Sequence, residues 1–275
     1  MMKRTALFTL LALASTLMTP PATAQDVKRG LTKVTGDVYR AQSKFHFSLV
    51  VVTSAGVVVV DPINKGAATW LKANIGSITA KPITHLIYSH SHGDHASGGA
   101  ALGAKTVVAH ASAPASIDGV TPTMRFKTKK MLKVGNKSFE MTYLGKGHGT
   151  DLIAVVVRPE NVGFIVDAAA PRRLPYRNFP HADIDAWIDQ IRTIESLDFE
   201  IFAPGHGNIG KKADATDARI YMQKMRWLVA EGLKAGKSID ELVNSVTMDE
   251  YRGWSQYKAW RALNVQGMAA YLQAK

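Results

Sequence analysis

Three histidines and an aspartate fall within six residues of one another in the first half of the chain. They are His90, His92, Asp94 and His95, and they follow the short apolar run Leu86-Ile87-Tyr88. If the backbone stays extended there, His95 points to the side opposite the other three, because side chains alternate along extended backbone. Imidazole and carboxylate are good ligands for zinc and other first-row metals. The loop is therefore predicted to offer ligands to two metal ions.

This loop resembles the signature loop of the metallo-β-lactamase superfamily, His-x-His-x-Asp-His, and Gly98-Gly99 follow it. The remaining parts of that family's pattern occur in order further along the chain. They are a histidine after a hairpin, a ligand at the end of a later strand, and a histidine in a Pro-Gly-His-Gly setting: His148, Asp167 and His206. The resemblance covers about residues 31–210.

The resemblance implies a dinuclear metal centre; zinc is the expected metal, with iron and manganese as the alternatives. One ion would be held by His90, His92 and His148, the other by Asp94, His95 and His206, with Asp167 bridging the two. A water or hydroxide between the ions would be the nucleophile, because metal binding lowers the pKa of water from 15.7 to about 7. Asp94 would additionally orient that nucleophile or carry a proton.

The elements that must position these residues alternate between strands and helices. Runs of β-branched and other apolar residues predict strands at 38–41, 47–52, 57–60, 85–88, 106–109, 152–157, 162–166 and 200–203, and a hairpin over 134–144. Apolar residues at helical spacing predict helices at 65–75 and 184–194, and 114–117 is predicted as a short helix. Such a mixture is typical of an α/β or α+β fold. The resemblance implies a four-layer αβ/βα sandwich with C-terminal helices, and residues 25–275 are predicted to form one domain.

Two helix starts are predicted from capping residues. Asp183 is placed to cap the helix that begins after it, and Ser238 and Glu241 have the spacing of a capping box.

The histidines outside the motif are interpreted as structural or surface residues. His85 precedes the motif strand, and His110 ends the next strand without an obvious partner. His46, between two phenylalanines, is interpreted as a surface residue rather than a pocket wall. His181 lies in the loop 171–182, which also holds three arginines. That loop is interpreted as solvated, or alternatively as a contact for an anionic group of a small-molecule substrate.

Residues 1–24 have the pattern of a secretory signal peptide. Lys3 and Arg4 form a positive start, residues 7–17 are apolar apart from small hydroxyl residues, and Ala22-Thr23-Ala24 is a small-residue cleavage site. Eleven apolar residues are too few to span a bilayer, which needs about 20. We therefore expect a mature chain that begins at Gln25, is periplasmic or secreted, and has no stable membrane anchor.

The chain is basic, with 34 Lys and Arg against 22 Asp and Glu. Its most densely basic stretch runs over residues 125–137 and is interpreted as the solvated face of a hairpin. No aromatic residues interleave with these charges to stack on bases, and an exported protein rarely meets nucleic acid. A nucleic-acid partner is therefore not expected.

The resemblance implies a hydrolase, and the preferred substrate is an ester, a lactone or a related acyl compound. The alternative is a true metallo-β-lactamase that acts on β-lactam antibiotics. The chain has no cysteine, which excludes the lactamase subclasses with a Cys ligand, and the remaining subclass generally lacks a carboxylate where Asp167 stands. The signal peptide argues against a nuclease, and the complete ligand set argues against a non-enzymatic metal-binding protein. Redox members with two irons usually have Glu where His92 stands, which argues against an oxygen-reducing iron protein. A mononuclear iron enzyme stays open as an alternative, because its ligand types overlap with these.

Overall fold

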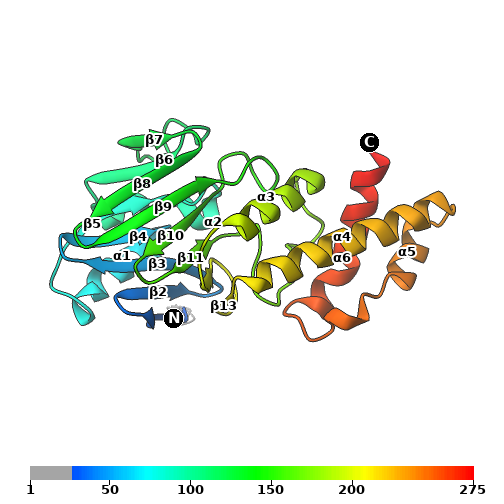
Figure 1. The fold of residues 1–275 in the computed structure, drawn as a ribbon, viewed down its shortest axis with the longest axis horizontal. Coiled ribbons are helices and arrows are strands. Elements are labelled where there is room, and N and C mark those ends of the chain that lie inside the picture. The colour runs from blue at the N-terminus through cyan, green and yellow to red at the C-terminus, as the bar shows by residue number, and fades with distance from the viewer. Residues whose placement is uncertain (1–26) are drawn as a thin grey trace, which may run out of the picture.

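A computed structural model describes residues 27–275, and the apolar runs of the sequence form two sheets that pack face to face (Figure 1). The signal peptide expected at residues 1–24 lies outside the described residues. None of the helices between residues 27 and 275 is long and apolar enough to cross a membrane.

The first sheet contains seven strands in the order of the sequence: β1 (Arg29–Thr35), β2 (Val38–Ser43), β3 (His46–Thr53), β4 (Gly56–Val60), β5 (Ile83–Ile87), β6 (Thr106–His110) and β7 (Met124–Phe126). The strands from β1 to β4 pair antiparallel, and those from β4 to β7 pair parallel. Parallel pairing matters for the site because the carboxyl ends of β4 and β5 then meet at one edge, with Val60 opposite Ile87.

The second sheet has the order β13-β12-β11-β10-β9-β8. Its strands are β8 (Lys129–Val134), β9 (Lys137–Tyr143), β10 (Ile153–Arg158), β11 (Val162–Ile165), β12 (Ile201–Pro204) and β13 (Gly210–Lys211). All neighbours are antiparallel except β11 and β12, which are parallel and place Ile165 opposite Pro204. This sheet therefore also has one edge where two strands end side by side.

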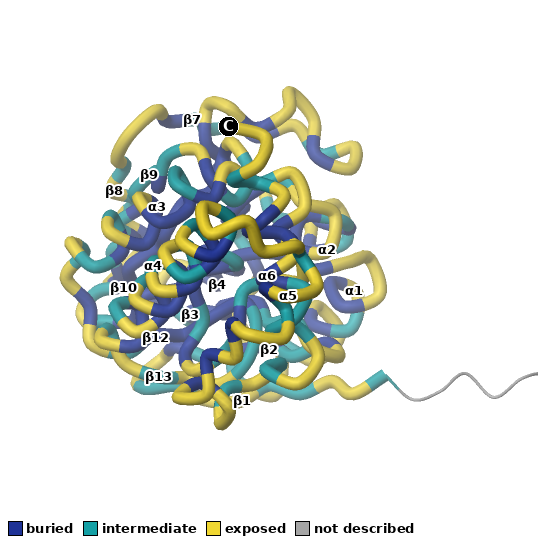
Figure 2. Tube along the Cα trace, turned by 90° about the vertical axis from the view of Figure 1, so that its right-hand side faces the viewer, coloured by how far each residue is buried: buried dark blue, intermediate teal, exposed yellow. Residues whose placement is uncertain are grey.

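Alternation along the strands builds the apolar layers, as residues of β4 illustrate. Val58 and Val60 belong to the core between the two sheets, whereas Val57 and Val59 belong to the core under α1 (Lys65–Asn74). Because both faces are covered, every residue of β4 is buried, and Figure 2 shows buried chain running through the middle of the molecule. The result is the α/β sandwich implied by the resemblance.

Helices cover the outer face of the second sheet and extend beyond it at the right of Figure 1. They are α3 (Ile184–Ser196), α4 (Ala213–Lys234), α5 (Ile239–Ser245) and α6 (Tyr257–Gln273). Asp183 caps α3 by accepting a hydrogen bond from the backbone N–H of Ala186, and the capping box at Ser238 and Glu241 is present. Both capping predictions are confirmed.

The short helix predicted at residues 114–117 is wrong. Ile117 instead forms an antiparallel bridge with Val120 across a turn in which Asp118 and Gly119 have positive φ. Glycine adopts that backbone region at little cost, so the dipeptide favours a turn over a helix.

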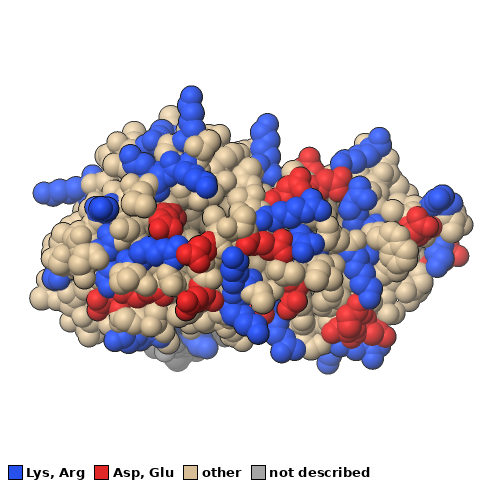
Figure 3. Space-filling model, in the orientation of Figure 1, with Lys and Arg blue, Asp and Glu red and all other residues tan. Residues whose placement is uncertain are grey.

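The basic stretch lies largely on the hairpin of β8 and β9. Lys129 and Lys133 are exposed on β8, while Val134 beside them is buried. In Figure 3, Lys and Arg side chains project into solvent in the region where β7 and β8 lie in Figure 1. The interpretation as a solvated face holds for these lysines of β8, but Lys137 at the start of β9 is buried and pairs with Asp37 and Glu160.

Candidate metal centre

Loops that follow the ends of parallel strands bring the motif residues together. His90 comes three residues after β5, Asp167 two residues after β11, and His206 two residues after β12. Because β11 and β12 are parallel neighbours, the loops that carry Asp167 and His206 leave the sheet side by side. Gly205 N donates to Ile165 O at 3.1 Å, a normal backbone hydrogen bond that continues the strand pairing into these loops. The sheets therefore fix the backbone that presents these side chains.

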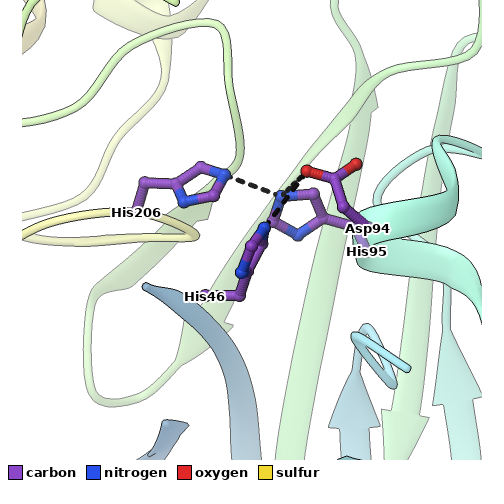
Figure 4. A group of neighbouring side chains, drawn as sticks. All are labelled: His46, Asp94, His95 and His206. Atoms are coloured by element: carbon purple, nitrogen blue, oxygen red, sulfur yellow. Dashed lines mark hydrogen bonds and ion pairs between the residues drawn. The ribbon is translucent and has the colours of Figure 1, made fainter. Parts of the chain in front are cut away.

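All seven residues implied as ligands lie in two neighbouring groups. Within each group, one ligand atom from every residue lies within 4.8 Å of the others. The first group is His90, His92, His148 and Asp167, and the second is His46, Asp94, His95 and His206. Figure 4 shows the second group, whose side chains converge from loops far apart in the sequence. His46 is the one member that the sequence did not predict.

Asp167 connects the two groups through its two carboxylate oxygens. Oδ2 lies 3.3 Å from His90 Nε2 and 3.2 Å from His148 Nε2. Oδ1 lies 3.1 Å from His206 Nε2 and 3.5 Å from His95 Nε2. The backbone of Asp167 has a φ of 58°, a conformation that costs free energy for a residue with a Cβ, although Asp tolerates it better than most residues. This is the arrangement expected of a carboxylate shared by two sites.

Asp94 does not point with His90 and His92, as continued extended backbone would require, but lies with His95 and His206, as the resemblance implies. The backbone is extended only as far as His92, and residues Gly93–Ala96 form the helical turn α2. In a helical turn consecutive side chains do not point to opposite sides, so Asp94 and His95 both belong to the second group. The six-residue loop still supplies both groups, but it does so by changing from extended to helical backbone.

Asp61, which follows β4, was missed by the sequence analysis and orders His90. The side chain of Asp61 is fully buried and accepts hydrogen bonds from Ser89 N at 2.7 Å and Ser89 Oγ at 2.6 Å. Since that hydroxyl donates to Asp61, it accepts from His90 Nδ1, 2.9 Å away. His90 then has no proton on Nε2, a buried atom without a hydrogen-bond partner that faces the first group. The sequence offered one sign of the role of Asp61, which is that a charged residue directly follows a fully apolar strand.

His206 is oriented in the same way by the main chain. Its Nδ1 donates to Phe45 O at 2.9 Å, so its Nε2 carries the lone pair and lies 3.0 Å from His95 Nε2. In the first group, His92 Nδ1 and His148 Nε2 face each other at 3.2 Å. Pairs of imidazole nitrogens this close repel unless a proton or a cation lies between them. The side chains present therefore fit a metal ion in each group.

Close packing against α3 positions His148. The backbone N–H of His148 donates to Gln190 Oε1 at 2.8 Å, and its ring makes an edge contact with Trp187. Gly147 has a φ of 154°, and a Cβ there would lie 2.7 Å from the backbone of Trp187. Only glycine allows the loop to approach the helix this closely.

The charges in the site change the pKa values of its members. Burial lowers the pKa of His90 to about 4. Burial acts in the same direction on His95, but the carboxylates of Asp167 and Asp61 outweigh it and raise the pKa to about 9. Burial raises the pKa of Asp61 to about 6, with His95 opposing it. The hydrogen bond from His46 lowers the pKa of Asp94, which keeps that carboxylate ionised.

A cavity of about 1070 Å³ opens over both groups. Its walls include Phe45, Arg173, Tyr176, Arg177, His181 and Trp260. The loop 171–182 therefore lines the cavity and is more than a solvated loop. Arg173 is half-buried, and its guanidinium lies 4.8 Å from the centre of the Trp260 ring, which holds it at the wall.

Of the four histidines outside the motif, His85 and His110 lie outside the cavity, whereas His46 and His181 line it. His85 Nδ1 is 2.8 Å from Thr84 Oγ1, outside the cavity. His110 has partners that the sequence did not show, because its Nε2 donates to Lys127 O and its ring stacks on Tyr143 at 3.8 Å. The interpretation of His46 as a surface residue is wrong, since it lines the cavity beside Asp94.

Comparisons with known proteins find chains of similar sequence. A family model described as the metallo-beta-lactamase superfamily matches residues 44–206. The chain is 26% identical over 237 residues to the 2,4-dinitroanisole O-demethylase subunit alpha of Nocardioides sp. (strain JS1661), covering 82% of this chain and 70% of that protein. It is 30% identical over 175 residues to the metallo-beta-lactamase type 2 of Bacillus sp. (strain 170), covering 60% of this chain and 67% of that protein.

Solved structures show the same fold at lower identity. The metallo-beta-lactamase from Pontibacter korlensis superposes with a TM-score of 0.61 at 22% identity, over 71% of this chain and 99% of that one. The stereoselective inverting sec-alkylsulfatase Pisa1 from Pseudomonas sp. superposes with a TM-score of 0.73 at 14% identity, over 88% of this chain and 50% of that one. At these identities the likeness concerns the fold alone.

Proposed function

The chain belongs to the metallo-beta-lactamase superfamily, and we propose that it is an exported hydrolase that uses two metal ions, with zinc as the metal, to cleave an ester, a lactone or a related acyl compound. The observation that carries this proposal is the position of Asp167, whose two oxygens face two separate groups of ligand atoms.

Each group has a distinct part in the proposed centre. His90, His92 and His148 would hold one ion, and Asp94, His95 and His206 the other, with Asp167 shared. Bound metal ions supply a water nucleophile of lowered pKa and polarise the scissile carbonyl. Asp94, whose side chain is 54% exposed toward the cavity, is ionised and can accept a hydrogen bond from the attacking water, which orients it.

The walls of the cavity support a small-molecule substrate with an anionic group and an apolar part. Arg173 and Arg177 bring positive charge to the cavity that holds the metal groups, and Tyr176 and Trp260 bring aromatic surface. A concave, partly apolar pocket with a few polar groups is the usual form of a small-molecule site. The arginines also raise the local concentration of anionic substrates.

Export is proposed from the sequence of residues 1–24 alone. Its charged start, apolar run and Ala22-Thr23-Ala24 have the order of a cleaved signal peptide. A mature chain that begins at Gln25 would then be periplasmic or secreted.

A substrate panel tests the proposed reaction. The purified protein, its metal content measured, is assayed on aryl esters, lactones, thioesters, phosphoesters and β-lactams. Aryl methyl ethers and alkyl sulfates are added because relatives are named for acting on such compounds. We expect kcat/KM on the order of 10⁴ M⁻¹s⁻¹ or more for an ester or lactone, the low end for a good enzyme, and far less for β-lactams. Fast β-lactam cleavage without ester cleavage would establish the alternative of a true β-lactamase and leave the metal groups unchanged.

A further inference from the structure

His46 stands among the metal-binding side chains although nothing in the motif includes it. It begins β3, directly after the turn at Lys44 and Phe45. Its Nε2 lies 3.2 Å from Asp94 Oδ2, and its ring makes edge contacts with His206 at 4.6 Å and His95 at 5.3 Å between ring centres (Figure 4). The side chain is 25% exposed and faces the cavity.

These spacings match those between the side chains already assigned as ligands. The rings of His95 and His206 are 4.8 Å apart, and those of His92 and His148 are 4.9 Å apart. Two atoms that bind the same ion at 2.0–2.1 Å are roughly 3.0–3.3 Å from each other, the lower value for the 90° angles of a five- or six-coordinate ion and the upper for a tetrahedral one. The 3.2 Å between His46 and Asp94 lies in that range. The same contact is a hydrogen bond in the structure, and it is longer than the ~2.7–2.9 Å of most charge-assisted ones.

We propose that His46 is an eighth protein ligand of the dinuclear centre, on the ion that Asp94, His95 and His206 would hold. This inference rests on the proposed metal centre. With His46 included, the second group has four ligands and the first group has three, and Asp167 is shared by both.

The main chain fixes His46 beside His206. Phe47 N donates to Gly205 O at 2.9 Å, and Phe45 O accepts from the ring of His206, so both neighbours of His46 are bonded to the loop after β12. The two histidines themselves form an antiparallel bridge. A ligand held in this way loses little freedom when an ion binds.

Arg40 also joins the β2–β3 hairpin to the loop after β12. Its guanidinium stacks on the ring of Phe47, 3.6 Å from the ring centre, and donates to Pro204 O at 3.2 Å and Gly207 O at 3.1 Å. Arg40 is 7% exposed, so these bonds are shielded from water. The β2–β3 hairpin and the loop that carries His206 are therefore one unit.

The larger ligand set has two consequences. The second group should bind its ion more tightly than the first, because it offers one more donor. It also leaves fewer positions open on that ion, so the ion held by His90, His92 and His148 should be the more accessible to substrate.

The test compares His46→Gln with His181→Gln, a matched control that removes another histidine of the same cavity. Both variants and the unchanged protein are loaded with Zn²⁺ or Co²⁺. Metal per chain, affinity by chelator competition, and the number of imidazoles per ion by X-ray absorption are measured. We expect His46→Gln to weaken one ion at least 10-fold and to lower the imidazole count, while His181→Gln matches the unchanged protein. His46→Asp, which retains an oxygen ligand, should recover part of the affinity.

Each other outcome has a defined meaning. If His46→Gln weakens the ion but leaves the imidazole count unchanged, His46 acts only by orienting Asp94, and the proposal is overturned. If the metal affinity and the imidazole count are both unchanged in His46→Gln, the proposal is overturned as well. The dinuclear centre then has seven protein ligands without His46. If the unchanged protein does not bind two ions, the proposed function itself is wrong. Circular dichroism of the metal-free variants separates loss of binding from loss of folding, and His46→Asp decides the question if His46→Gln does not fold.

Discussion

Asp61 lies behind His95, on the side of the imidazole ring away from the cavity, with Asp61 Oδ2 3.6 Å from His95 Nδ1. Both side chains are fully buried. The ring of His95 thus lies between one carboxylate behind it and the carboxylate of Asp167 in front of it. The contact is too long for a hydrogen bond, so Asp61 acts on His95 through its charge, which helps to raise the pKa of the imidazole.

Replacing Asp61 tests this support. Asp61→Asn removes the buried charge and one acceptor of the Ser89 hydroxyl, so the hydrogen-bond chain to His90 loses its direction. We expect metal affinity to fall about 10–100-fold, the usual effect of losing a residue that orients a ligand. Chelator competition measures it. If Asp61→Asn folds and its metal affinity is unchanged, Asp61 contributes only to the packing of the core.

Asp167 is predicted to be needed for the second ion. The unchanged protein should bind about two ions per chain, and Asp167→Ala should lose at least one, because the shared negative charge that offsets the two cations is gone. Hydrolysis should fall by about 100-fold or more. Elemental analysis after dialysis, together with kcat/KM, gives both numbers.

Asp167→Ser separates the preferred reaction from the alternative. It imitates the β-lactamase subclass without a Cys ligand, so the ester or lactone activity should fall while weak β-lactam cleavage remains or rises. A variant of Asp167 that keeps two ions and full activity would contradict the shared position.

Arg173 is predicted to bind the anionic group of the substrate. A hydrogen bond to a charged group contributes about 1.5–3 kcal/mol, so Arg173→Ala should lower kcat/KM for anionic substrates by about 10–100-fold. Neutral analogues with the same leaving group should be nearly unaffected. Arg173→Lys keeps the charge but not the planar stacking on Trp260, so we expect an intermediate value. Equal losses on charged and neutral substrates would argue against the assignment.

The contact between α3 and α4 should depend on pH through Asp185. The hydrogen bond from Arg226 lowers the pKa of Asp185 from 3.8 to about 2, and burial opposes it. The stabilisation is therefore present above pH 3.8 and is lost as the pH falls through 2. Because Asp185 is partly exposed, Asp185→Asn should lower the free energy of unfolding at pH 7 by at most about 1 kcal/mol. Denaturant titrations at pH 7 and pH 2 should show the difference between the two proteins only at pH 7.

Export predicts a defined N-terminus. Mass analysis of the protein recovered from the periplasm or the medium should find a chain that begins at Gln25. Changing Ala22 and Ala24 to bulky residues should block the cleavage, because the processing site accepts small side chains there. An uncleaved protein found only in the cytoplasm would refute the signal peptide.

Local patterns in the sequence predicted much of the sheet structure. Val57 to Val60 and Ile153 to Val157 form strands because β-branched and other apolar residues favour extended backbone covered on both faces. The metal-binding residue types could be predicted from the sequence because closely spaced histidines such as His90, His92 and His95 are typical of metal sites. The direction of Asp94 could not, because a single helical turn leaves no periodic pattern to detect.

The sequence by itself therefore determined the seven ligand positions that the family resemblance implies, and most of the strands that present them. Tertiary structure alone decided which further residues join them. His46 meets Asp94 across 48 residues, and Phe45 meets His206 across 161. A lone histidine or a main-chain carbonyl carries no signal of its own. These groups became part of the site because the β2–β3 hairpin packs against the loop after β12, and that contact depends on the pairing and packing of whole sheets.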